Sequence, residues 1–579
     1  MAFLRNLLAT LVGLTLFTFF GFIFFAGIVS ALESDEIPSV KENSILYLNM
    51  GGVVVERSIE DPLAEILPNS GPRMIGLTDI LKSIKYAKED AKIKGIYMEH
   101  RYLGASYASL KEIRDALIDF QESGKFIYAY GEYVSEGDYY LGSIADSVYL
   151  HPNGSLEFNG LSANITFWKG LFDKLEVKPE IFRVGKYKSF VEPFIRKDMS
   201  DQNREQYMVL LKGIYEIFLE GIAESRKIAV DDLADMSENL RIQLPIDALE
   251  NGLIDVTGYE DEVKSKLAQR IGVDEAKDIN FISLGSYKKT VGSGKYSNDK
   301  IAVIVADGDI VMGGDDNTIV GERFAREIRN ARESSSVKAI VLRINSPGGS
   351  LVASDLIWRE VSLTKGVKPI IASMSGVAAS GGYYIAMNAD TIVAQPNTIT
   401  GSIGIFGMMF NLENFLENKL GITHDVVKTG EHSDIYTVTR QLSDHERSII
   451  QRGVDDGYKT FITKAAEGRG VTPEDIDEVG GGRVWTGKQA LEAGLVDVLG
   501  SYQDAIELAA EAAGLETYRV RYYPQQKQLL EQLMGQMRDE VRSGVWSDAG
   551  ELGAFADEIK ILSGMKGLQA RMPADITIQ

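Results

Sequence analysis

Ser380 lies in a setting that suits an acyl-transfer nucleophile. It is the serine of the stretch Ala-Ala-Ser-Gly-Gly-Tyr-Tyr at 378–384, just after the apolar run 369–372. Such a nucleophile needs an exposed hydroxyl at a strand-to-helix turn, small neighbours that admit a peptide, and a free backbone N–H to bind the oxyanion. The alternative is a structural serine in a tight glycine-rich turn, and the surrounding sequence must decide between the two.

A second glycine-rich loop could complete the oxyanion hole. Residues 338–343 predict a strand that runs into Ser-Pro-Gly-Gly-Ser at 346–350. Glycines after a strand expose backbone N–H groups without obstruction by a Cβ atom. We expect one oxyanion donor from Gly348 or Gly349 and the other from Gly381.

The candidate base for the serine is a lysine. The chain has few histidines, none in a motif-like setting: His100, His151, His424, His432 and His445. Sequence distance alone does not exclude a Ser-His-Asp triad. A lysine acts as a base near pH 7 only when it is desolvated, and aromatic and apolar residues of the stretch 182–194 flank Lys188. The alternative is a surface lysine whose stem lies along apolar neighbours.

These segments together resemble one protease family. The motifs at 185–194, 346–350, 378–384 and Thr-Gly-Ser-Ile-Gly-Ile-Phe-Gly at 400–407 are similar to those of signal peptide peptidase A, in its long two-domain bacterial form, protease IV. The resemblance covers roughly residues 1–520. It implies a membrane-anchored serine protease of the Clp-protease/crotonase superfamily.

The resemblance also implies roles for particular residues. Ser380 would be the nucleophile, Lys188 the general base, and Ser402 an extra serine that orients the lysine. The substrates would be signal peptides left in the membrane after cleavage and other unfolded chains, and the protein would form a homotetramer. The small residues around Ser380 favour peptides with small or apolar side chains before the cut.

An internal repeat supports the split of this site between two domains. Residues 137–140 align with 381–384 at a shift of 244, and residues 248–255 align with 490–497 at a shift of 242. A shift that stays nearly constant over this length indicates two copies of one α/β unit.

Each copy holds half of the candidate site. The first copy has Glu136 opposite Ser380, and the second has His432 or Ser433 opposite Lys188. Together the copies contain one Ser/Lys pair, which we expect to form within one chain. The alternative makes the first copy a scaffold and His432 the base.

The N-terminus predicts a single membrane anchor. Residues 7–32 carry no charge, and a span of the hydrocarbon core needs about 20 residues. Arg5 precedes them, which favours a cytoplasmic N-terminus. A signal peptide cleaved near 29–31 is the alternative, but its apolar region normally runs only about 7–15 residues. We therefore expect a single-pass protein of the bacterial inner membrane, with its catalytic domains on the periplasmic or extracytoplasmic side.

The predicted fold is α/β, a tandem repeat of two Clp-protease/crotonase-like domains behind an N-terminal transmembrane helix. Long helices are expected over 205–225 and 446–466. The expected boundaries are a cytoplasmic end at 1–6, the anchor at 7–32, a linker at 33–43, the N-terminal repeat with the general base at 44–272, a linker at 273–299, the C-terminal repeat with the nucleophile and oxyanion loops at 300–520, and a tail without an assigned role at 521–579.

Composition excludes several other functions. A net charge of −22, from 83 acidic and 61 basic residues, argues against nucleic-acid binding. Without cysteine there is no thiol nucleophile, disulfide or thiolate metal site. Neither a phosphate-binding loop nor a His-Glu-x-x-His motif occurs, so we expect no cofactor and no metal. Two rival functions remain, a crotonase-like enzyme acting on acyl-CoA and an inactive membrane scaffold that binds peptides.

Overall fold

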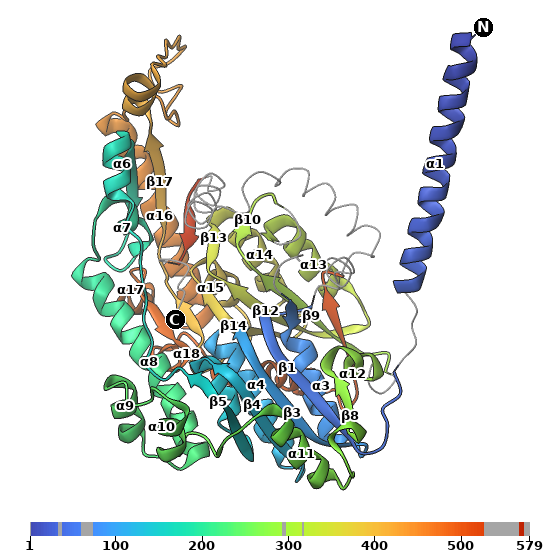
Figure 1. The fold of residues 1–579 in the computed structure, drawn as a ribbon. Coiled ribbons are helices and arrows are strands. Elements are labelled where there is room, and N and C mark those ends of the chain that lie inside the picture. The colour runs from blue at the N-terminus through green and yellow to red at the C-terminus, as the bar shows by residue number, and fades with distance from the viewer. Residues whose placement is uncertain are drawn as a thin grey trace.

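The computed structural model describes residues 2–32, 38–58, 73–291, 297–314, 318–525 and 567–572. Among these residues the strands form sheets of seven, six and eight strands (Figure 1). The seven- and eight-stranded sheets are the centres of two α/β units, and the six-stranded sheet combines strands from both parts of the chain.

The first unit is built on a parallel sheet. Its strands lie in the order β8 (Asn280–Ser283), β1 (Ser44–Val55), β3 (Ile93–Gly104), β4 (Phe126–Val134), β5 (Ser147–Leu156) and β7 (Val256–Thr257), and β2 (Met74–Gly76) also pairs with β1. Its helices are α3 (Leu77–Glu89), α4 (Tyr107–Gln121), α5 (Glu136–Gly142), α9 (Val230–Glu238), α10 (Pro245–Glu250), α11 (Glu260–Ile271) and α12 (Leu284–Thr290).

The second unit repeats this order. Its parallel strands are β20 (Arg519–Tyr523), β9 (Lys300–Asp307), β12 (Val337–Ser346), β14 (Ile370–Ala379), β15 (Thr391–Ala394) and β19 (Val498–Leu499), with β16 (Ile399–Gly401) and β18 (Val484–Thr486) beyond β14. Its helices are α13 (Gly321–Glu333), α14 (Leu351–Thr364), α15 (Gly381–Ala386), α17 (Pro473–Val479), α18 (Gly487–Glu492) and α19 (Tyr502–Ala512). β9 is apolar and buried from Ile301 to Ala306, as expected for a parallel strand covered on both faces.

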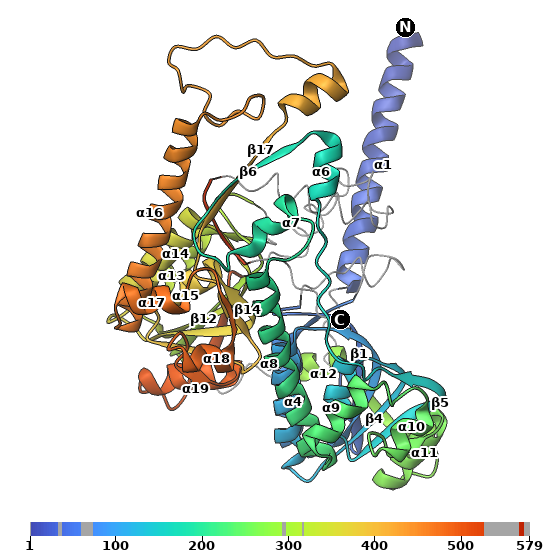
Figure 2. The same ribbon diagram turned by 90° about the vertical axis from the view of Figure 1, so that its left-hand side faces the viewer.

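Two long helices confirm the expectation of matching helices in the two copies. They are α8 (Asp201–Arg226) and α16 (Asp444–Arg469), and each begins at a serine whose side chain accepts a backbone N–H of the first turn, a strong helix start. α8 runs between the two units (Figure 2). Its Leu210 and Ile214 pack with Ala379 and Val484 of the second unit.

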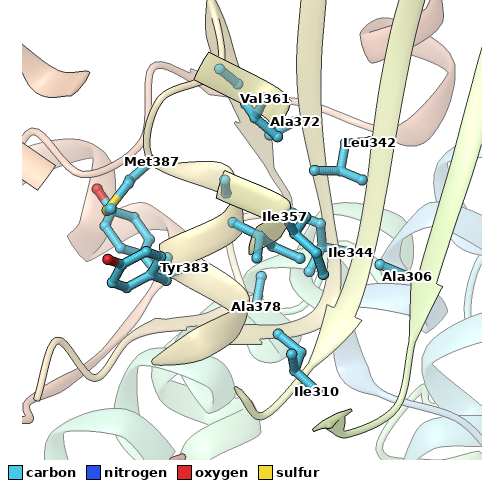
Figure 3. Close-up of a cluster of buried hydrophobic side chains, with 14 of the residues drawn as sticks. Ala306, Ile310, Leu342, Ile344, Ile357, Val361, Ala372, Ala378, Tyr383 and Met387 are labelled. Carbon is cyan, nitrogen blue, oxygen red and sulfur yellow. The ribbon is translucent and has the colours of Figure 1, made fainter. Parts of the chain in front are cut away.

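The hydrophobic core of the second unit fixes the elements on either side of Ser380. Ala378 at the end of β14 and Tyr383 of α15 are fully buried, and they pack in one cluster with Ile344 and Ile357 (Figure 3). The turn between β14 and α15 is therefore anchored at both ends.

The six-stranded sheet crosses between the units. Its order is β11 (Ile319–Val320), β10 (Ile310–Val311), β13 (Gly348–Ser350), β21 (Gln569–Arg571), β17 (Phe406–Asn411) and β6 (Lys178–Arg183). In Figure 2, β6 and β17 extend away from the two large sheets, together with α6 (Lys169–Leu175). The antiparallel pairing of β6 with β17 brings the loop after β6 to the second unit.

A buried ion network joins the two units. Arg343 of β12 is 1% exposed and contacts Glu56 at 2.7 Å and Glu112 of α4 at 2.9 Å. Ser373 and Ser375 of β14 accept further hydrogen bonds from the guanidinium group. One arginine from the second unit thus contacts two carboxylates of the first.

The linker expected over 273–299 is wrong for much of its length. β8 pairs with β1, and α12 buries Leu284 and Tyr287 in the core of the first unit. The Gly/Ser-rich composition favoured a linker, but backbone pairing and two large apolar side chains hold this segment on the unit. The tail expected from residue 521 onward begins inside β20. Residues 526–566 and 573–579 of this tail lie outside the described residues, and so do residues 33–37 of the first expected linker.

The N-terminal segment is one helix, α1 (Ala2–Leu32). It stands apart from both units in Figure 1 and Figure 2. Within the part of the chain that the structure describes, no helix qualifies as a membrane span by its length and apolar character. The transmembrane anchor therefore stays a prediction.

Candidate active site

Ser380 occupies a constrained turn between β14 and α15. Its backbone angles are φ 54° and ψ −110°, a conformation that a non-glycine residue adopts only when its surroundings impose it, at a cost of about 1–3 kcal/mol. The surroundings here are hydrogen bonds on both sides: its N–H donates to Gly401 O at 2.8 Å, and its carbonyl accepts from Tyr384 N at 2.8 Å. A sharp turn of this kind is typical of a nucleophile held at the end of a strand.

Lys188 reaches this serine from the first half of the chain. It lies in the loop between β6 and a short 3-10 turn at Ser189–Val191. Its Nζ atom is 2.8 Å from Ser380 Oγ, 3.1 Å from Ser402 Oγ and 3.1 Å from Ser402 O. The structure thus brings together, within one chain, all three residues that the sequence assigned to catalysis.

The site is buried, and among the residues that the structure describes no carboxylate contacts the lysine amine. Lys188, Ser380 and Ser402 are each 0% exposed. Burial lowers the pKa of the Lys188 amine well below its ordinary value, because desolvation disfavours the charged form. Within the described part of the chain, the polar partners of Nζ are two hydroxyls and a carbonyl, and none of these favours the charged amine as a carboxylate would. A neutral amine in this position can accept a proton from the serine.

Two glycines make room for the lysine. A Cβ on Gly482 would lie 2.5 Å from Lys188 N, and a Cβ on Gly404 would lie 3.1 Å from Lys188 Cδ. Arg183 also donates to Lys188 O at 3.2 Å, and Gln206 donates to Tyr187 O at 3.2 Å. The loop backbone is therefore fixed on both sides of the lysine.

These supporting residues were not predicted from the sequence. Gly482 belongs to a run of three glycines at 480–482, which is a visible signal for a special backbone. Arg183 and Gln206 carry no such signal, since the contacts by which they hold the Lys188 loop are to backbone carbonyls.

The predicted oxyanion glycines lie beside the serine turn. Gly348 and Gly349 have φ of 108° and 149°, which glycine adopts without strain. A Cβ on Gly348 would lie 2.7 Å from Gly381 N, so the two loops meet. Gly348 N–H donates to Ser346 Oγ at 3.2 Å, which leaves Gly349 as the better oxyanion donor beside Gly381.

His432, the alternative base, and Glu136, which aligns with Ser380 in the first copy, have partners outside the Ser380 site. His432 Nδ1 lies 3.1 Å from Glu446 Oε1, in a cluster with Arg440. Glu136, opposite Ser380 in the repeat, accepts the N–H groups of Asn159 and Gly160 at 2.7 Å each. Glu136 therefore fixes a loop of the first unit.

Comparison with known proteins identifies the class and the family. A sequence profile of peptidase family S49 matches residues 119–274 and 362–516, one match in each copy of the repeat, and a Clp protease profile matches residues 292–400. The chain is a serine protease with a mixed α/β fold. It belongs to peptidase family S49.

Relatives from two distant organisms support the assignment to a protease family. The chain is 37% identical to Protease 4 of Salmonella typhi, over 86% of this chain and 83% of that protein. It is 35% identical to the chloroplastic serine protease SPPA of Arabidopsis thaliana, over 82% of this chain and 70% of that protein. A solved structure of a ClpP1 variant from Listeria monocytogenes matches with 17% identity over 35% of this chain and 94% of that chain, at a TM-score of 0.24.

Proposed function

We propose that the protein is a membrane-anchored endopeptidase that uses Ser380 and Lys188 as a catalytic dyad on extended peptides. The observation that carries this proposal is the 2.8 Å contact between Lys188 Nζ and Ser380 Oγ in a fully buried site. Burial lowers the lysine pKa, and a lowered pKa is what a lysine needs to act as a base near neutral pH.

The mechanism follows from the positions of these groups. The Ser380 hydroxyl donates to the neutral Lys188 amine and attacks the carbonyl carbon of the scissile bond. The developing oxyanion receives N–H groups from Gly381 and Gly349. Lys188 then passes its proton to the leaving amine, and water hydrolyses the acyl-enzyme through the same base. Ser402 Oγ lies 3.1 Å from Lys188 Nζ and orients the amine towards Ser380.

The cellular setting is part of the same proposal. α1 carries Arg5 before an uncharged stretch, which supports a single anchor in the bacterial inner membrane with the catalytic domains outside the cytoplasm. A protein of Enterococcus faecium that is 35% identical over 238 residues is named a putative signal peptide peptidase. Signal peptides remaining in the membrane would be held near an anchored site at high local concentration. The family resemblance adds a homotetramer.

Four variants test the dyad. Ser380→Ala and Lys188→Ala should abolish hydrolysis of an apolar reporter peptide. Lys188→Arg should be equally inactive, because arginine stays protonated. His432→Ala should keep its activity. In the wild-type enzyme, kcat/KM should rise with pH to a plateau as Lys188 loses its proton.

Other outcomes would contradict the proposal. Hydrolysis by Lys188→Ala at the wild-type rate, or turnover of acyl-CoA thioesters in place of peptides, would exclude it. Recovery of proteolysis when Ser380→Ala and Lys188→Ala are co-expressed would mean that the pair forms between chains. For the anchor, alkaline phosphatase fused just after Val40 should be active, and an N-terminus that begins at Leu32 would contradict it.

A further inference from the structure

The strand that carries Ser380 changes partners just before the nucleophile. β14 pairs with β15 as far as Met374 and with β16 from Val377 onward. On the other side of β14, Asn345 of β12 stands alone opposite residues 375–377. These residues form a bulge, and a bulge bends a strand and re-aims its side chains, often beside an active site. The direction in which β14 presents Ser380 therefore depends on how this bulge is held.

The side chain of Asn345 holds the bulge through both of its amide atoms. Its Oδ1 atom accepts the Val377 N–H at 3.2 Å, and its Nδ2 atom donates to Asp307 Oδ1 at 2.9 Å. Asn345 and Asp307 are register partners on the neighbouring strands β12 and β9, directly after the residues Ile344 and Ala306 that Figure 3 labels. A carboxylate only accepts hydrogen bonds, so Asp307 fixes which end of the amide faces Val377.

The same residue leads into the oxyanion loop. Asn345 lies directly before the Ser-Pro-Gly-Gly stretch that ends at Gly349, and its carbonyl accepts the Gly308 N–H at 2.9 Å. Its side chain thus holds the strand that ends at Ser380, while its backbone continues into the candidate oxyanion donor. Asn345 therefore joins two parts of the acyl-transfer site, the nucleophile and the N–H groups that stabilise the oxyanion.

The first unit shows that the sheet forms without this pair. In β3 and β1 the corresponding register positions hold Arg101 and Gly51. The Arg101 side chain is 60% exposed and donates to Glu99 of its own strand at 2.6 Å. β3 still pairs in parallel with β1 and β4. Asn345 and Asp307 therefore accompany the nucleophile, and the fold of the repeat does not require them.

Asp307 lies where its negative charge is unfavourable. Burial and the neighbouring carboxylate of Glu56 raise the pKa of Asp307 to about 6, against smaller opposite effects of the Asn345 side chain and of Arg343. At neutral pH Asp307 is still largely ionised. A carboxylate kept in such surroundings is explained by the hydrogen bond that it accepts from Asn345, since a charged acceptor makes a stronger bond than a neutral one.

We propose that Asn345, held by Asp307, is a positioning residue of the peptidase reaction, which fixes Ser380 and the oxyanion donor Gly349 relative to one another. This inference rests on the proposed function and adds to it a residue that acts through the backbone. Neither Asn345 nor Asp307 takes part in proton transfer. Loss of the pair should therefore slow the chemical step, which appears in kcat, and should leave KM almost unchanged.

Asn345→Ala tests the position of the bulge. Its kcat on an apolar reporter peptide should fall about tenfold, less than the about 100-fold that a full ångström costs. Ser373→Ala is the matched control, because it removes a hydrogen bond of 3.0 Å that Arg343 donates to the same strand before the bulge. Both variants should unfold at a slightly lower temperature than the wild type, but Ser373→Ala should keep its kcat.

The outcomes separate this inference from the proposed function. An active wild type with an unchanged kcat in Asn345→Ala, or with an equal fall in Ser373→Ala, would overturn the inference alone. A wild-type protein that hydrolyses no peptide would overturn the proposed function, and the inference with it.

Asn345→Asp tests the partnership with Asp307. This variant keeps an acceptor for the Val377 N–H but places a second carboxylate against Asp307, so one proton is shared between the two until the pH is raised far enough to remove it. Above neutral pH the ratio of its kcat to the wild-type kcat should fall as the pH rises, because the two charged groups then repel each other. The corresponding ratio for Asn345→Ala should stay constant. A constant ratio for Asn345→Asp as well would show that Asp307 does not hold Asn345, and would contradict the inference.

Discussion

Gly482→Ala should disable the enzyme by moving Lys188, without touching any group that reacts. The added Cβ would lie 2.5 Å from Lys188 N and 2.6 Å from Lys188 Cα, whereas ordinary contact begins at 3.4 Å, so the loop must open by about 0.9 Å. A misplacement of about 1 Å in a catalytic group can cost about 100-fold in rate. We therefore expect kcat on a reporter peptide to fall about 100-fold while KM changes little.

Gly481→Ala is the matched control. Both glycines have positive φ, 60° for Gly481 and 87° for Gly482, so each alanine costs about 1–2 kcal/mol in backbone strain. The Cβ on Gly481 would meet nothing nearer than 3.9 Å. Both variants should lose stability in urea unfolding, Gly482→Ala the more because its Cβ also meets the backbone of Lys188, but only Gly482→Ala should lose kcat. Equal kcat in the two variants would refute the claim that the position of Lys188 limits the rate.

Three further substitutions probe the site and the joint between the units. Lys188→Met should raise the free energy of unfolding at neutral pH, because the wild-type lysine gains a proton on unfolding. The difference in free energy between the variant and the wild type should shrink as the pH rises towards the ordinary lysine pKa. Urea titrations that show no pH trend in this difference would contradict a depressed pKa. Ser402→Ala should lower kcat about fivefold, the equivalent of one hydrogen bond of about 1 kcal/mol, and an unchanged kcat would remove its orienting role. Arg343→Met leaves two buried carboxylates without their partner and should reduce the free energy of unfolding by about 3–5 kcal/mol; a loss below 1 kcal/mol would show that the network does not hold the units together.

The serine half of the site could be predicted because its parts are local. Ser380 and Gly381 are neighbours in sequence, and the strand–turn–helix pattern around them is readable from apolar runs and glycines. Lys188 lies 192 residues away from Ser380. Only the repeat and the family motif linked Lys188 to Ser380, because local sequence patterns do not show contacts between residues so far apart in the chain.

The repeat also predicted the α/β fold and its long helices. The Gly/Ser-rich composition of residues 273–299, in contrast, led to the wrong prediction of a linker. The pairing of β8 with β1 is made by backbone groups, which are present whatever the side chains are. The Gly and Ser residues of this segment therefore did not indicate the strand. The same reason hid β21, whose position depends on two open strand edges elsewhere in the chain. Gly482 escaped notice because its importance lies in what it allows another residue to do.

The most direct test of the dyad is labelling with a serine-reactive fluorophosphonate probe, followed by mass spectrometry that identifies the labelled residue. The wild-type protein should carry the label on Ser380, with a labelling rate that rises with pH as Lys188 becomes neutral. Lys188→Met should keep its fold and lose the labelling, because among the described residues Lys188 is the base that contacts Ser380 Oγ. Label on another residue, or undiminished labelling of Ser380 in Lys188→Met, would contradict the account.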